Sequence, residues 1–420
     1  MQKHFQILII GGGSGGIMTA ANLLQKNKDL KIGIVEPAEF HYYQAAWTLV
    51  GANAFDFDKS RKPMADVMPQ GVDWIKDYAT GFKSEENKIT TKNSGELSYD
   101  FLVVSPGLIM APELIEGLPE ALEKGIAVSN YVDPKKTWNA IKNFKGGNAV
   151  FTQPTTPIKC GGAPQKIAYL AADYFRKTKL ASKTNLILAM PGSVIFGVPE
   201  IRKTLEEVIA RYDIKFKPSY APVKIDCENK TIRFKHTAPL ENQCVINTDP
   251  SIGEKDWGDS FIEIPFDLLH IAPPQTAPKF MLESDLMNEA GWMDVDINTL
   301  QHKKYKNIFG IGDVAALPTA KTGAAIRKQV PVVVGNIQYL MQHDRLGDKI
   351  YDGYSSCPLV TGYGKMVLAE FNYKNEFTPD PKLKQMLVFN SDKEHWRLWM
   401  LKKHILPNLY WNKMLKGKEV

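Results

Sequence analysis

A glycine-rich turn near the N-terminus places the strongest constraint on the fold of this chain. Residues 7–10 are wholly apolar and predict a strand, and residues 17–24 have the spacing of a helix. The turn between them fits the pattern GxGxxG and consists of Gly11, Gly12, Gly13, Ser14, Gly15 and Gly16. Glycines at these positions allow a tight turn, a close approach of the backbone to a pyrophosphate, and close helix packing. The segment therefore predicts a dinucleotide-binding strand–turn–helix unit.

A carboxylate follows at the distance expected for a ribose contact. Residues 31–35 predict a second strand that ends at Glu36, 20 residues after Gly16. In dinucleotide-binding folds an acidic residue at about this distance binds the ribose hydroxyls. The strand, the helix and the carboxylate together argue against an incidental glycine turn.

Two distant segments favour FAD over NAD as the dinucleotide. Residues 307–313 predict a short strand that ends in Gly312 and Asp313, before a helix expected at 323–340. In two-domain flavoproteins a strand of this form returns to the first domain, and its aspartate binds FAD; the alternative for Asp313 is a helix N-cap. Residues 99–107 resemble the strand that closes the FAD domain in such proteins. Their last residues and two further positions complete the expected FAD contacts: Ser105, Pro106, Gly107, Gln44 and Ala79.

The middle of the chain predicts a second domain of the same class with a different loop. Strands are expected at 148–152, 185–190 and 223–226, and helices at 165–177 and 198–212. The loop after the first of these strands has no GxGxxG pattern and instead contains Cys160 between prolines. We therefore do not expect NAD(P)H to be the electron source.

These segments predict an α/β protein with two Rossmann-like dinucleotide-binding domains. The FAD-binding domain is expected at residues 1–110 and 300–375, and the second domain at 111–299. Residues 376–420 change in character, because Trp396, Trp399 and Trp411 alternate there with lysines and aliphatic residues. We predict two short amphipathic helices, separated at Pro407, that lie in a membrane interface. The alternative is that they pack on the core of the protein or on a dimer partner.

The four cysteines divide into two kinds. Cys160 precedes a predicted helix, and the helix dipole with Lys159 and Lys166 should lower its pKa and favour the reactive thiolate. Cys357 follows the helix at 323–340, so chain order can return it to the flavin. The other two, Cys227 and Cys244, have no catalytic context and are expected to be small apolar residues.

Composition excludes several classes of function. The net charge is only +6, and no basic block interleaves with aromatics in the main body, so nucleic acid is not an expected partner. The first strand begins about four residues into the chain, which leaves no room for a signal peptide. No apolar run reaches the roughly 20 residues that span a bilayer.

Several unusual motifs give the chain a specific resemblance over nearly its whole length. They lie at residues 41–44, 47–51, 157–166, 290–296, 309–313, 356–363 and 409–412. The chain resembles the sulfide:quinone oxidoreductase family, in particular the branch with the animal mitochondrial enzymes. This resemblance implies a peripheral protein of the bacterial cytoplasmic or mitochondrial inner membrane, with membrane lipid as a partner; a homo-oligomer is left open.

The resemblance also implies a mechanism. Cys160 and Cys357 would be joined through sulfur, directly or with an extra bridging atom, and sulfide would attack this bridge. Cys357 would carry the outgoing sulfane sulfur to glutathione, sulfite or polysulfide, while Cys160 passes two electrons to FAD and on to a quinone. No third cysteine lies near residues 120–135, so FAD is expected to be non-covalent. No metal is expected.

Further residues receive roles from this resemblance and from their positions. Lys328, on the helix at 323–340, is expected to stabilise negative charge near the flavin or the quinone, or else to be a solvated surface lysine. His41 is expected near the substrate or the flavin, or else as a packing histidine. The expected quinone contacts are Pro358, Leu359, Val360 and Tyr410.

Three other functions remain as alternatives. A type II NADH:quinone oxidoreductase shares FAD and two domains but needs an intact second glycine loop. A flavocytochrome-type sulfide dehydrogenase needs a cytochrome partner and usually export. A non-catalytic FAD-binding signalling protein would not require both Cys160 and Cys357.

Overall fold

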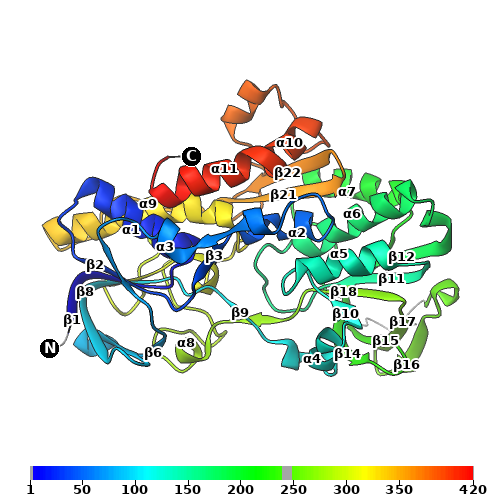
Figure 1. Cartoon of the computed structure of the whole chain (residues 1–420), viewed down its shortest axis with the longest axis horizontal. Helices are drawn as coiled ribbons and strands as arrows, with labels where there is room; N and C mark the ends of the chain where they lie inside the picture. Colours follow the sequence, from blue (N-terminus) through cyan, green and yellow to red (C-terminus); the bar gives the residue numbers. More distant parts are fainter. Residues whose placement is uncertain (1–2, 239–247, 420) are drawn as a thin grey trace.

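The first domain is built on a seven-stranded sheet at the N-terminal end of the molecule. The computed structural model describes residues 3–238 and 248–419, and Figure 1 shows its arrangement. The strand order is β5-β2-β1-β8-β7-β6, with β20 also paired to β8. The strands are β1 (Lys3–Ile10), β2 (Ile32–Val35), β5 (Val72–Ile75), β6 (Ala79–Lys83), β7 (Lys88–Thr91), β8 (Glu96–Val104) and β20 (Ile308–Gly310).

Strand β8 joins the two distant parts of this domain. Its first half pairs antiparallel with β7, while its second half pairs in parallel with β20, where Ile308 lies opposite Leu102. Both faces of the sheet are covered, which explains why β1 is apolar at successive positions. Helices α1 (Ser14–Lys26) and α9 (Gly323–His343) pack on one face around Ile7 and Ile9. The predicted return of residues 307–310 to the first sheet is therefore observed.

The second domain has a parallel sheet of five strands in the order β10-β18-β11-β12-β13. Its strands are β10 (Ala127–Val128), β11 (Gly147–Thr152), β12 (Thr184–Met190), β13 (Lys215–Pro218) and β18 (Leu268–Ile271), and its helices are α5 (Pro134–Asn143), α6 (Ala163–Lys177) and α7 (Pro199–Arg211). The helices predicted at 165–177 and 198–212 thus exist to within two residues. The mixed α/β, Rossmann-like class follows for both domains.

A four-stranded antiparallel sheet extends the second domain beyond this prediction. Its order is β14-β15-β17-β16, from β14 (Tyr220–Asp226), β15 (Thr231–His236), β16 (Lys255–Gly258) and β17 (Phe261–Pro265). The strand predicted at 223–226 belongs to this sheet and not to the parallel one. Cys244 lies outside the described residues.

Two segments lie elsewhere than the predicted boundaries place them. A ribbon of β9 (Ile109–Met110) and β19 (Gln275–Thr276) connects the domains, and Ala277 and Met281 already pack against Phe5 of the first domain. The return therefore precedes the predicted boundary at residue 300. The hairpin of β21 (Ser355–Gly362) and β22 (Lys365–Phe371) packs mainly against the core of the second domain, although β21 also contacts α9 of the first.

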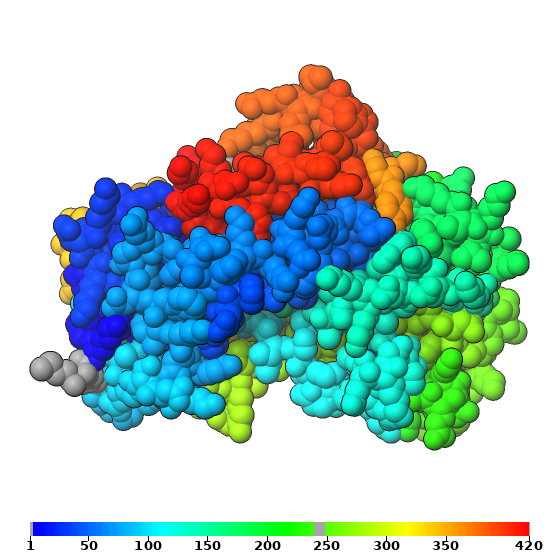
Figure 2. Space-filling view, in the orientation of Figure 1, coloured from blue at the N-terminus to red at the C-terminus, as the bar shows by residue number. Residues whose placement is uncertain are grey.

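The C-terminal segment crosses the molecule above both domains, as Figures 1 and 2 show. It is one continuous run of α10 (Trp396–Met400), a π-helical turn η9 (Leu401–Ile405) and α11 (Leu406–Asn412). Pro407 therefore does not separate two helices, because it lies in the first turn of α11, where its missing N–H is tolerated. Leu398 packs in the second domain's core and Trp411 in the first domain's.

The remaining short elements support this frame. They are β3 (Phe40–Tyr42), β4 (Arg61–Pro63), α2 (Trp47–Val50), α3 (Met64–Val67), α4 (Leu118–Glu123) and α8 (Lys279–Leu282). Within residues 3–238 and 248–419, no helix has both the length and the apolar character needed to cross a membrane.

Candidate functional site

The glycine loop between β1 and α1 forms an open cradle. Gly11 has φ +96°, and a Cβ there would collide with the carbonyl oxygen of Ser105. A Cβ at Gly13, in contrast, would meet no atom within 4 Å. No side chain caps the start of α1, so its first N–H groups face this free space. A diphosphate at the helix N-terminus would fit both the space and the free donors.

The predicted ribose carboxylate lies beside this loop. Glu36, directly after β2, accepts hydrogen bonds from the backbone N–H of Gly12 at 2.7 Å and of Ala38 at 2.7 Å. Burial raises the pKa of Glu36 although both hydrogen bonds oppose the shift. The structure therefore holds Glu36 against the glycine loop, and its contact with a ribose remains a prediction.

A chain of hydrogen bonds links the loop to the C-terminal helix. Tyr410 Oη lies 2.6 Å from Ser14 Oγ and 2.6 Å from His41 Nε2, and His41 Nδ1 lies 3.1 Å from the Gly12 carbonyl oxygen. Burial lowers the pKa of His41 to about 4, so the ring is neutral near pH 7. Because a carbonyl only accepts, Nδ1 carries the proton and Nε2 accepts from Tyr410. His41 is therefore fixed against the glycine loop, and its contact with the flavin or the substrate stays a prediction.

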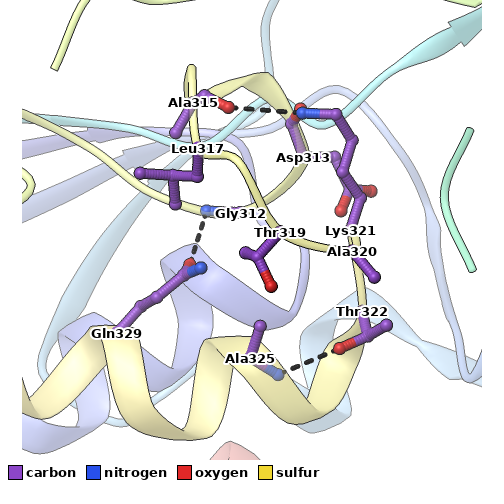
Figure 3. Close-up of a pocket in the computed structure, with 10 residues that line it drawn as sticks. All are labelled: Gly312, Asp313, Ala315, Leu317, Thr319, Ala320, Lys321, Thr322, Ala325 and Gln329. Carbon is purple, nitrogen blue, oxygen red and sulfur yellow. Dashed lines mark hydrogen bonds between the residues drawn. The ribbon is translucent and has the colours of Figure 1, made fainter. Parts of the chain in front are cut away.

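The segment after β20 closes the other side of the first domain's site. Figure 3 shows Gly312 beside Gln329 of α9, and Lys321 folded back toward Asp313 and Ala315. Gly312 N–H donates to Gln329 Oε1 at 2.9 Å, and Lys321 Nζ donates to the carbonyl oxygen of Asp313 at 2.5 Å. Burial raises the pKa of Asp313 and lowers that of Lys321 to about 8.

The other predicted FAD contacts fall in different surroundings. Ser105 is buried and donates its hydroxyl to the Ile10 carbonyl oxygen at 3.2 Å, and Pro106 and Gly107 follow it at the end of β8. Gly107 has φ +71°, and the space beside it is open. Gln44 is exposed, and Ala79 begins β6. The open spaces at Gly13 and Gly107 leave room for FAD, and the contacts of Gln44 and Ala79 with it stay predictions.

Lys328 is not brought to this group. It is exposed on α9, where its Nζ lies 5.6 Å from the centre of the Tyr354 ring. The buried residue next to it, Gln329, is the one that contacts Gly312. Neighbouring helical residues point about 100° apart, so Gln329 faces Gly312 and Lys328 points toward solvent, and a contact of Lys328 with the flavin stays a prediction.

Cys160 occupies a constrained turn that touches the first domain. Its φ is +54°, a left-handed conformation that is uncommon for a residue with a side chain. Its N–H donates to the Lys321 carbonyl oxygen at 2.7 Å, and its carbonyl oxygen accepts from Tyr131 Oη at 3.0 Å. The loop of the second domain is therefore fixed next to Lys321 and Asp313, at the predicted FAD site.

Cys357 meets Cys160 from strand β21. Cys357 Sγ lies against the backbone of Gly162, two residues after Cys160, and the two thiols shift each other's pKa, although 197 residues separate them in sequence. Cys357 is 2% exposed. The start of its strand is held by Ser355, whose hydroxyl donates to the Ala320 carbonyl oxygen at 3.2 Å. Cys227, in contrast, lies against the Gly117 carbonyl oxygen, with its Sγ 3.8 Å from that atom.

Two buried lysines set the electrostatics of the thiol pair. Lys166 Nζ lies 3.0 Å from Cys160 Sγ. The hydrogen bond from Cys357, together with the charges of Lys166 and Lys402, holds the pKa of Cys160 well below its usual range, while the pKa of Cys357 is raised. Burial would lower the pKa of Lys166, but the adjacent thiols outweigh it and raise that pKa. Cys160 is therefore the thiolate of the pair.

Lys402 is a buried lysine whose charge acts on the thiol pair and which the sequence does not single out. It lies in the π-helical turn of the C-terminal segment, is 3% exposed, and donates to the Ala45 carbonyl oxygen at 2.8 Å. Burial and the charge of Lys166 lower its pKa to about 8. The only sequence signal is a lysine among tryptophans and leucines, which also describes a membrane-facing helix.

The four predicted quinone contacts do not form one group. Tyr410 packs in the first domain's core cluster, whereas Leu359 and Val360 are fully buried in the second domain's cluster. Pro358, directly before Leu359, is half-buried. Tyr410 is the member that contacts the glycine loop, through Ser14.

A cleft of about 600 Å³ opens beside the loop that holds Cys160. Its walls include Pro157 and Phe196 of the second domain, Trp292 and Lys321 of the first, and Phe371 of the hairpin. Lys321 Nζ lies 4.0 Å from the centre of the Trp292 ring. The cleft therefore has apolar walls and a cation, next to the segment that holds Cys160.

Comparisons with known proteins agree with this site. Residues 5–334 match the family model "Pyridine nucleotide-disulphide oxidoreductase". The mitochondrial sulfide:quinone oxidoreductase of Mus musculus is 39% identical over 99% of this chain and 87% of its own length. The solved sulfide:quinone oxidoreductase of Aquifex aeolicus has a TM-score of 0.78 at 19% identity, over 99% of this chain and 92% of that one.

A solved NDH2 of Plasmodium falciparum shares the fold at a lower level. Its TM-score is 0.64 at 10% identity, over 100% of this chain and 99% of that one. The likeness in sequence is thus far stronger to the sulfide enzymes than to this one. The chain therefore belongs to the pyridine nucleotide-disulphide oxidoreductase family and, within it, to the sulfide:quinone oxidoreductases.

Proposed function

We propose that this protein oxidises sulfide through Cys160 and Cys357 and passes the electrons by way of FAD to a quinone. The observation that carries the proposal is the approach of Cys357 Sγ to Gly162, two residues after Cys160, beside Lys321 and Asp313. That approach puts a redox-active pair where the second domain of a two-domain flavoprotein would otherwise bind a nicotinamide nucleotide.

The sulfur chemistry balances around this pair. HS⁻ attacks one sulfur of a Cys160–Cys357 bridge, the S–S bond breaks, and one cysteine becomes a persulfide while the other leaves as a thiolate. A nucleophilic acceptor removes the outer sulfur and leaves a second thiolate. The two thiolates then rejoin as a bridge with loss of two electrons. When bound, FAD supplies the acceptor for these two electrons and delivers them to the quinone.

Lys166 and Lys402 fit the role of counter-charges in these steps. The thiolate that leaves the bridge is more stable beside an ammonium group, and a persulfide anion needs the same support. Lys166 is placed for Cys160 by the 3.0 Å contact. We assign the leaving thiolate to Cys160, because its pKa is lowered, and the persulfide to Cys357.

FAD would be held without a covalent bond. Its diphosphate would lie at the cradle of Gly11, Gly13 and Ser14, and Asp313 and Ser105 would contact the chain that leads to the ring. No cysteine occurs between residues 120 and 135, where other branches carry a flavin-linking thiol. Denaturation should therefore release all of the flavin into the supernatant.

A small sulfur acceptor would reach the persulfide through the 600 Å³ cleft. Glutathione and sulfite are both anionic, and Lys321 supplies a positive charge in the wall. Rapid mixing of the sulfide-treated enzyme with each acceptor would identify which one removes the sulfur. Lys321→Met should weaken the use of both, and an unchanged affinity would remove the cleft from the reaction.

Membrane lipid and quinone would meet the C-terminal region. Five exposed apolar side chains gather there: Leu387, Phe389, Trp396, Met400 and Ile405. Exposed aromatics next to lysines favour a bilayer interface. Phe389→Ser with Trp396→Ser should reduce flotation with liposomes, whereas Trp257→Ser, on the distant strand β16, is the matched control. Equal flotation of all variants would exclude this surface.

One anaerobic experiment tests the function itself. Each addition of sulfide in an anaerobic titration should bleach the flavin, and a ubiquinone analogue should restore its colour. NADH should not bleach it, because the second domain has no glycine loop. Bleaching by NADH in place of sulfide would instead support a type II NADH:quinone oxidoreductase.

A further inference from the structure

Two neighbouring glycines follow Cys160, and their surroundings are opposite. A Cβ built at Gly161 would meet nothing within 4 Å. A Cβ built at Gly162 would lie 2.6 Å from Cys357 Sγ and 2.7 Å from Leu359 Cδ2, closer than real Cβ atoms approach other atoms. Cys357 and Leu359 thus occupy the space that a side chain at Gly162 would take.

The backbone of Gly162 does not itself require glycine. Its φ of −80° and ψ of −5° are open to any residue. Gly162 directly precedes α6, and no side chain caps the start of that helix. The local backbone therefore gives no reason for a glycine at this position, whereas the approach of β21 does.

Strand β21 has little freedom to move away. Ser355, Cys357 and Leu359 are alternate residues and lie on one face of the strand. Ser355 Oγ is bonded to the Ala320 carbonyl oxygen at 3.2 Å and to Thr322 Oγ1 at 2.9 Å. The Lys321 carbonyl oxygen, between those two residues, holds the N–H of Cys160. Residues 320–322 therefore anchor both cysteine segments. The space beside Gly162 then determines how closely Cys357 Sγ approaches the loop that holds Cys160.

We propose that Gly162 is a positioning residue that sets the separation of the Cys160 and Cys357 sulfurs. A single methyl group there would push Cys357 out of reach of Cys160 while the glycine loop at residues 11–16 stays unchanged. The inference rests on the proposed function only in treating these two thiols as the redox pair.

The test compares Gly162→Ala with Gly192→Ala. Gly192 lies in the exposed loop after β12, and the nearest atom to an added Cβ is the Val194 carbonyl oxygen at 3.6 Å. Three measurements are made on each full-length flavoprotein: its FAD content, the cysteines alkylated after denaturation of the air-oxidised protein, and the rate of flavin bleaching by sulfide.

We expect Gly162→Ala to keep its FAD but to leave Cys160 and Cys357 open to alkylation. Bleaching should slow on the order of a hundredfold, because a misplacement of about 1 Å has that effect on a reacting pair. Gly192→Ala should match the parent protein. A protected cysteine pair and a parental rate in Gly162→Ala would overturn the proposal.

A double-mutant cycle on stability tests the geometry without activity. Cys357→Ala removes the sulfur that would collide with the new methyl group, so Gly162→Ala should lower the melting temperature less in that background than in the parent. Equal decreases in both backgrounds would overturn the proposal. If sulfide bleaches neither the parent nor Gly192→Ala, the proposed function fails, and the cycle still decides the positioning role.

Discussion

The two domains make the same connection and use it for different chemistry. In each, a strand from the interior of the sheet runs into a helix, β1 into α1 and β11 into α6. The connection in the first domain is short and rich in glycine, and the space at Gly13 is open. The connection in the second domain is longer, contains Cys160 in a left-handed turn, and is filled at Gly162 by Cys357.

This difference shows how a nucleotide site becomes a thiol site without a change of fold. The free N–H groups at the start of α1 would stabilise a diphosphate, whereas Lys166 and Lys402 stabilise the Cys160 thiolate in the second domain. The first domain leaves room for a ligand, whereas the second brings in a strand and two lysines, Lys166 and Lys402. The anion that lies before α6 is thus a side chain of the protein, the Cys160 thiolate, and not a bound ligand.

Removal of either thiol should break the comparison most completely. Cys160→Ser and Cys357→Ser should each reduce sulfide-dependent quinone reduction to background, because the bridge needs both sulfurs. The FAD content should not change, since the glycine loop lies in the other domain. Steady-state assays with sulfide and a quinone measure the loss. Cys227→Ser, whose thiol lies against Gly117, should keep parental turnover.

An alanine in the first connection should have the reverse effect. Gly11→Ala forces a side chain into a left-handed backbone, at about 1–2 kcal/mol, and against the Ser105 carbonyl oxygen. The purified protein should contain much less FAD, measured by its absorbance at equal protein concentration. The bridge between Cys160 and Cys357 should still form, as judged by alkylation. Full FAD occupancy would contradict the cradle.

Loss of Lys166, the lysine in contact with Cys160, should lower the reactivity of the Cys160 thiol without abolishing it. In Lys166→Met the ammonium 3.0 Å from Cys160 is absent, so the pKa of Cys160 should rise. The thiolate is the form that iodoacetamide alkylates, so the pH profile of alkylation follows the pKa of Cys160. We expect this profile of the reduced enzyme to move to higher pH in Lys166→Met, with slower alkylation at any pH below the raised pKa. Lys177→Met, on the exposed part of the same helix, is the control.

The sequence predicts the parts of this site that depend on local spacing. The glycine loop, the strand before Glu36, the return at Gly312 and the helix after Cys160 all follow from apolar patterns and turn residues. The same patterns place Lys328 on α9 but do not give its direction, since one residue of helical phase decides whether Lys328 or Gln329 faces Gly312.

Local sequence patterns do not predict contacts between segments that are far apart in the chain. The approach of Cys357 to Cys160 was expected from chain order and resemblance, but nothing local indicated the space at Gly162. The antiparallel sheet of β14 to β17 was missed because its strands follow the α/β pattern without a break in composition. Lys402 was missed because an amphipathic segment packs equally well on a membrane and on a protein core, and only the fold decides which lysine is buried.

Lys402 gives the smallest effect and the sharpest test of the thiol site. Its pKa is lowered to about 8 from the usual 10.5, so it is charged at pH 7 and loses its proton as the pH rises through 8. The support for the Cys160 thiolate should fall with that charge, and flavin reduction by sulfide should decline with an apparent pKa of about 8. Lys402→Arg, which stays charged, should shift this decline to higher pH, while Lys402→Met should be slower at pH 7 and lack the decline.

The pKa of Lys321 is also lowered to about 8, but Lys321 lies beside Asp313 and outside the lysine pair at the thiols. If the decline is the same in both Lys402 variants, it belongs to Lys321 or to another group, and the charge of Lys402 does not act on the thiolate. If it moves as expected, the C-terminal helix contributes directly to the second connection, and the two domains differ in charge supply as well as in loop shape.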